Sequence, residues 1–110
     1  DNPYFGSPAS FVGSCTTCHN TPNVGNHSLA IALDIGLTDA SRRTPDMPLY
    51  TLRNIASGEI MQTMDPGLAL STGKWQDIGK FKGAILRGLA ARAPYFHDGS
   101  AADLAAVVEL

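Results

Sequence analysis

The chain has 110 residues, a formal net charge of -2, 44% hydrophobic residues and 7% aromatic residues. This length predicts one small domain, over residues 1–110, with little hydrophobic core to spare. The few basic residues form no run, which argues against a nucleic-acid partner, and no apolar stretch approaches the ~20 residues that a membrane span needs.

The first half of the chain predicts short elements separated by loops. Ser7-Pro8 combines an N-cap residue with a proline at the first helical position, which predicts a short helix that runs toward residue 15. Residues 20–28 are rich in Asn, Gly and Pro and predict a loop. Large and small residues alternate over 29–35, which favours a short extended segment, and a polar loop is expected over 38–48.

The second half predicts mostly helices, with an irregular stretch at 78–83. The expected helices are 49–57, a brief helix from Asp65-Pro66 to near Gly73, 83–93, and a last helix that begins at the capping-box-like residues 100–103 and holds Leu104, Val107 and Val108. The last helix is cut off at Leu110, which predicts that the chain is a fragment of a longer protein. The fold class expected from these elements is all-α, small and loop-rich.

One motif of the sequence indicates a cofactor. It is the run Cys15-Thr16-Thr17-Cys18-His19, because C-x-x-C-H is the attachment signature of c-type haem. Residues three apart share one face of a helical turn, so both thiols can reach the vinyl groups along one edge of the porphyrin. The histidine that follows is then the proximal ligand of the iron. We expect one covalent haem c. Because aromatic side chains are few, the haem would also supply much of the apolar volume of the core.

Three other interpretations of the cysteine pair stay open. A thioredoxin-like redox pair would need a βαβ context, and no parallel-strand pattern surrounds the motif. A zinc site would need four ligands, for which His27 and His97 are irregularly placed candidates. A local disulfide between Cys15 and Cys18 is the third alternative.

The order of further motifs resembles the C-terminal haem domain of the bacterial di-haem cytochrome c peroxidase family. The resemblance rests on the segments Cys18-His19-Asn20, Phe81–Arg87, Ala93–Ser100 (APYFHDGS), and Leu104 with Val107-Val108. It covers nearly the whole chain and implies a cytochrome-c-like helical fold. It also implies that the haem passes electrons toward a second haem in another domain.

The chain departs from this family in three places. The peroxidases carry two C-x-x-C-H motifs where this chain has one, and Gly88 stands where the family usually has Asn. The family's distal ligand, a Met or Tyr, would fall just beyond Leu110. If the chain itself supplies the sixth ligand, the candidates are Met47, Met61 and Met64, of which we favour Met64, with His97 as the nitrogen alternative.

Other side chains are candidates for the haem surroundings. Arg87 is the preferred partner of a haem propionate because it lies in the family-like segment, and Arg53 and Trp75 are further candidates. The resemblance makes His97 a residue of the turn before the last helix, hydrogen-bonded near the haem edge. His27 is expected to be solvated.

The predicted function is one-electron transfer through the covalent haem to a redox protein partner or a second haem domain. The alternative is a part of a di-haem cytochrome c peroxidase that reduces hydrogen peroxide, and a gas sensor is a third hypothesis. Since this kind of haem attachment takes place outside the cytoplasm, the resemblance implies a periplasmic or exported protein.

Overall fold

The computed structural model describes residues 18–19 and 31–109. These residues fall into two compact units, one formed by Ile31–Phe81 and the other by the described residues 18–19 and 82–109. Each unit is described by itself. The prediction of a single domain over residues 1–110 stays a prediction.

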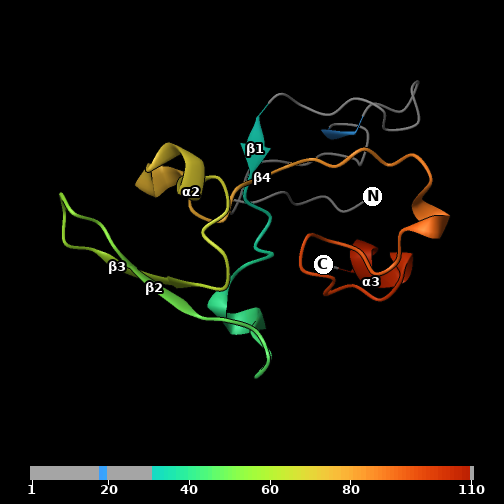
Figure 1. Ribbon diagram of the computed structural model, residues 1–110, viewed down its shortest axis with the longest axis horizontal. Coiled ribbons are helices and arrows are strands. Elements are labelled where there is room, and N and C mark those ends of the chain that lie inside the picture. The colour runs from blue at the N-terminus through green and yellow to red at the C-terminus, as the bar shows by residue number, and fades with distance from the viewer. Residues whose placement is uncertain (1–17, 20–30, 110) are drawn as a thin grey trace. The chain divides into compact units, whose positions relative to one another are not determined.

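An antiparallel hairpin is the longest regular structure of the first unit (Figure 1). Strand β2 (Tyr50–Arg53) pairs with strand β3 (Ile60–Thr63), with Leu52 directly opposite Met61. The turn between the strands is closed at Asn54, whose backbone N–H donates to the carbonyl of Glu59 at 2.8 Å. The helix predicted over 49–57 is therefore wrong, since β-branched and aromatic residues in this stretch find a cross-strand partner.

The buried centre of this unit lies where β3 ends. Thr63 is only 3% exposed, and its hydroxyl lies 3.1 Å from the carbonyl oxygen of Thr38 and 2.9 Å from that of Asp65. The backbone N–H of Met64 donates to the same Thr38 oxygen at 2.9 Å. Leu37 is buried beside Thr38 in the sequence, so a short loop segment and a strand end together make the core.

Helix α2 (Ala69–Thr72) ends where the sequence predicted a helix to end. Gly73 caps it in the left-handed conformation, at a φ of 67°, and donates its N–H to Ala69. The helix begins later than predicted, because Asp65 accepts a hydrogen bond from the N–H of Gly67 (2.7 Å) and so holds a turn instead of capping the helix.

The stretch around residue 80 is more regular than expected. A 3-10 turn, η2 (Trp75–Asp77), is followed by strand β4 (Phe81–Lys82), which pairs with β1 (Ala32–Leu33). Strand β1 confirms the extended segment predicted within 29–35. The polar loop predicted over 38–48 holds one short turn, η1 (Ala40–Arg42).

Residues 82–109 of the second unit contain two short helical elements. Only η3 (Leu89–Ala91) is helical within the predicted helix 83–93, which is therefore wrong. Gly88 adopts a left-handed conformation at the start of this turn, which interrupts any helix that crosses it. Helix α3 (Leu104–Val108) confirms the last predicted helix, and its N-cap is Asp103, whose side chain accepts from the N–H of Ala106 at 2.9 Å.

The predicted all-α, cytochrome-c-like fold is wrong for the part of the chain that the structure describes. The described residues include the short helices α2 and α3, of four and five residues, and two two-stranded sheets. Glycines with positive φ at seven positions between Gly36 and Gly99 keep the intervening segments too short for long helices. None of the described helices has the length and apolar character to cross a membrane.

Candidate functional site

The described part of the C-x-x-C-H motif consists of Cys18 and His19. Cys18 is buried, with 7% of its surface exposed, and the ring of His19 is half-buried. Cys15, the first cysteine of the motif, lies outside the described residues, as do the predicted helix from Ser7 and the loop over 20–28. The attachment of a haem through both cysteines therefore stays a prediction.

The Nδ1 atom of His19 is buried, and the described structure supplies no hydrogen-bond partner for it. A buried polar atom without a partner costs about 1–3 kcal/mol. Histidines that bind a metal use one ring nitrogen as the ligand and commonly donate from the other. A half-buried ring whose Nδ1 has no partner among the described residues, directly after a buried cysteine, fits a histidine that binds a haem iron.

The zinc alternative includes Cys15 and His27, which lie outside the described residues, so that alternative stays open. No group of three or more His, Cys, Asp or Glu side chains lies close enough together within residues 18–19 and 31–109 to hold a metal ion. Haem iron needs no such cluster, because the porphyrin supplies four of its ligands and the protein supplies the axial ones.

The three methionine candidates differ in exposure. Met64 is 6% exposed at the end of β3, Met61 is 38% exposed on the same strand, and Met47 is half-buried in the preceding loop. All three belong to the first unit, whereas His19 belongs to the second. The role of Met64 as a distal ligand stays a prediction.

The other candidates lie mostly on the surface of their units. Arg87 is exposed in the turn before η3, and Arg53 is exposed on β2. Trp75 is half-buried in η2, and His97 is exposed in the turn before α3, the place that the resemblance implied. His27 lies outside the described residues.

The segment Ala93–Ser100 (APYFHDGS) forms a closed loop that precedes α3 in the chain. Tyr95 and Ala101 pair through both backbone hydrogen bonds, of 2.7 and 3.3 Å, and the Tyr95 hydroxyl donates to the carbonyl of Leu89 at 2.8 Å. Phe96 has a φ of 65°, which is rare for a bulky residue and costs about 1–2 kcal/mol. The bridge between Tyr95 and Ala101 holds this conformation. The segment on which the sequence resemblance rests therefore has a well-defined backbone.

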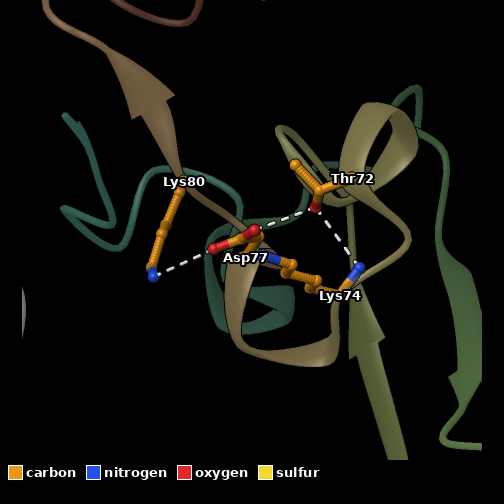
Figure 2. A network of polar contacts seen from close by, with 4 residues as sticks. All are labelled: Thr72, Lys74, Asp77 and Lys80. Carbon is orange, nitrogen blue, oxygen red and sulfur yellow. Dashed lines mark hydrogen bonds and ion pairs between the residues drawn. The ribbon is translucent and has the colours of Figure 1, made fainter. Parts of the chain in front are cut away.

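A polar network joins α2 to η2 (Figure 2). Asp77 accepts a hydrogen bond from the hydroxyl of Thr72 at 2.8 Å, and Lys80 forms an ion pair with it at 3.2 Å. The backbone N–H of Lys74 donates to the Thr72 oxygen at 3.3 Å. The Thr72 hydroxyl, and after it Lys80, hold the pKa of Asp77 below its ordinary value.

Two further carboxylates of the first unit have a lowered pKa. The backbone N–H of Ser41 donates to Asp39 at 2.9 Å, and this bond is the main cause of the low pKa of Asp39. The hydroxyl of Thr44 has the same effect on the pKa of Asp46. The hydrogen bonds of Asp39, Asp46 and Asp77 described above are all local. None of these bonds joins a carboxylate to a residue of the predicted haem site.

Thr63 and the hairpin that ends at this residue were not predicted from the sequence. The available signal was a pair of strand-like runs, Tyr50–Arg53 and Ile60–Thr63, separated by a stretch with Asn54 and Gly58 that suits a turn. Nothing in the sequence marks Thr63 as buried, because its partners lie 25 residues away at Thr38 and next to it in the turn at Asp65.

A buried cysteine followed by a half-buried histidine in a C-x-x-C-H run is the kind of site at which c-type cytochromes hold their haem. The chain is 35% identical, over 100 residues, to the cytochrome c551 peroxidase of Nitrosomonas europaea. The match covers 90% of this chain and 24% of that protein, so the chain spans about a quarter of the length of this curated relative. No protein-family model and no solved structure matches the chain.

Proposed function

We propose that this chain is a haem-binding part of a protein related to the cytochrome c peroxidases, and that it transfers single electrons. One observation carries the proposal: the 35% identity to a cytochrome c551 peroxidase extends over 90% of a chain that contains the C-x-x-C-H run. A match of that length leaves roughly a tenth of the chain outside it, so it takes in residues 15–19. The buried Cys18, and the buried Nδ1 of His19 that has no partner among the described residues, support the same site.

The residues of the site have separate tasks in this proposal. Cys15 and Cys18 hold the porphyrin through thioether bonds, and His19 is the proximal axial ligand. Arg87 binds a propionate through its guanidinium group. Met64 is the proposed distal ligand. When bound, the haem supplies an iron centre that gains or loses one electron.

The first experiment tests attachment. The chain is expressed together with a haem-attachment system, denatured, and measured by intact mass spectrometry. We expect the mass of the polypeptide plus one haem, and its loss when both Cys15 and Cys18 are changed to Ser. The variant His97→Ala is the matched control and keeps the covalent haem. A colourless chain in which both thiols still react with an alkylating reagent contradicts the proposal.

The second experiment tests the axial ligands. A low-spin ferric spectrum with a sulfur-to-iron charge-transfer band is expected, and Met64→Leu removes the band whereas Met47→Leu keeps it. If Met64→Leu leaves the band unchanged, Met64 is not the ligand.

The alternative function is reduction of hydrogen peroxide as part of a larger enzyme, and the name of the N. europaea relative favours it. A high-spin, five-coordinate haem that turns over peroxide would support this alternative against electron transfer. In either case, the proposed partner is a redox protein or a second haem domain. The proposed location is the periplasm or the cell exterior, where this type of haem attachment takes place.

A further inference from the structure

The two methionines of the sequence Met61-Gln62-Thr63-Met64 have opposite environments. Met61 lies on strand β3 with 38% of its surface exposed, whereas Met64, three residues later, is 6% exposed. Two methionines three residues apart therefore differ in environment, because Met61 is exposed to solvent and Met64 is buried in the first unit. Solvent access decides which methionine an aqueous oxidant reaches.

Met61 also belongs to an apolar face of the hairpin. It lies directly opposite Leu52, and Tyr50 is two residues from Leu52, so these three side chains share one face of the two strands. Tyr50 is itself exposed, and Leu52 is half-buried. A change in the polarity of Met61 therefore changes the polarity of a surface, whereas a change at Met64 would disturb the buried centre around Thr63.

We propose that Met61 is a peroxide-sensitive modification site that controls the polarity of this hairpin face. The thioether sulfur attacks one oxygen of a hydroperoxide and takes it up as a sulfoxide. The O–O bond breaks, the sulfur loses two electrons, and the second peroxide oxygen leaves as water after protonation. The product replaces an apolar side chain by a polar, chiral one, and methionine sulfoxide reductases can reverse the reaction.

Met64 is protected in the same chain because its side chain is buried. The exposed fractions of 38% and 6% predict that Met61 is oxidised faster than Met64. The proposal depends on the exposure of the two methionines, and it does not require that the chain binds haem.

The test follows oxidation site by site. The purified chain is treated with excess hydrogen peroxide, and in a parallel sample with chloramine-T, which oxidises accessible thioethers without iron. Peptide mass spectrometry over time gives the rate at each methionine. We expect Met61 to react first with both oxidants, and reductase treatment to return its peptide to the unmodified mass. Equal rates at Met61 and Met64, or a preference for Met61 with peroxide alone, would overturn the proposal.

Two variants test the consequence for the surface. Oxidation is expected to shorten the retention of the native chain in hydrophobic-interaction chromatography. Met61→Leu keeps the volume and the apolar character of the side chain, so its retention should not change on oxidation. Met47→Leu is the matched control and should still show the shift. If Met61→Leu shows the same loss of retention as the native chain, the polarity change arises elsewhere and the inference is wrong.

Discussion

Gly67 is the residue whose replacement is expected to destabilise the first unit most sharply. It has a φ of 58°, and a Cβ at this position would lie 2.6 Å from the carbonyl oxygen of Lys80 and 3.1 Å from Cζ of Phe81. The approach is close because the chain segments on either side are hydrogen-bonded. Leu68 donates to the same Lys80 oxygen at 2.9 Å, and Gly79 donates to the carbonyl of Pro66 at 3.1 Å.

The cost of Gly67→Ala has two parts. A left-handed backbone costs an alanine about 1–2 kcal/mol. The contact with the Lys80 oxygen is with backbone, which cannot rotate away as a side chain can, and overpacking of this kind costs about 1–3 kcal/mol. We therefore expect Gly67→Ala to lower the free energy of unfolding by about 2–5 kcal/mol, a large share of the 5–15 kcal/mol that is typical of a folded domain.

Gly73→Ala is the matched control. Gly73 has a φ of 67°, and nothing lies within 4 Å of the place where its Cβ would be. This variant has the backbone cost of about 1–2 kcal/mol alone. Urea titration followed by far-ultraviolet circular dichroism gives both free energies, and hydrogen exchange at the amides of Leu68 and Gly79 reports the local effect. Equal losses for the two variants would refute the contribution of the close contact.

Two further predictions concern the first unit. Thr63→Val removes a hydroxyl that bonds to Thr38 and Asp65, so it should lower the free energy of unfolding by about 1–3 kcal/mol in urea titration. The control Thr51→Val, on the exposed surface of β2, should leave the free energy of unfolding almost unchanged. Similar losses for the two variants would contradict the role of Thr63. For Asp77, the folded pKa lies below the ordinary value of 3.8, so its stabilising effect is complete above that pH and is lost as the pH falls through the folded pKa. An NMR titration of its carboxyl group should show a midpoint below 3.8 that rises in Thr72→Val, and an unchanged midpoint in the variant would be evidence against the hydroxyl as the main cause.

Features that depend on near neighbours in the chain were predictable from the amino-acid sequence. The C-x-x-C-H run identified the candidate site because the motif is contiguous. The end of α2 at Gly73 and the helix after Asp103 were predictable because helix caps form between residues within about four positions of one another. The motif alone also pointed to haem, since its chemistry depends on the two thiols and the adjacent imidazole.

Features that depend on partners far away in the chain became visible only in the folded structure. Residues 49–57 contain helix formers such as Leu52 and Ala56, yet the pairing of Tyr50–Arg53 with Ile60–Thr63 made the first part a strand. The folded structure also leaves Met61 exposed and buries Met64, a difference that their spacing does not predict. The physical reason is that strand pairing and burial are properties of contacts between segments, and neither segment specifies its partner by its own composition.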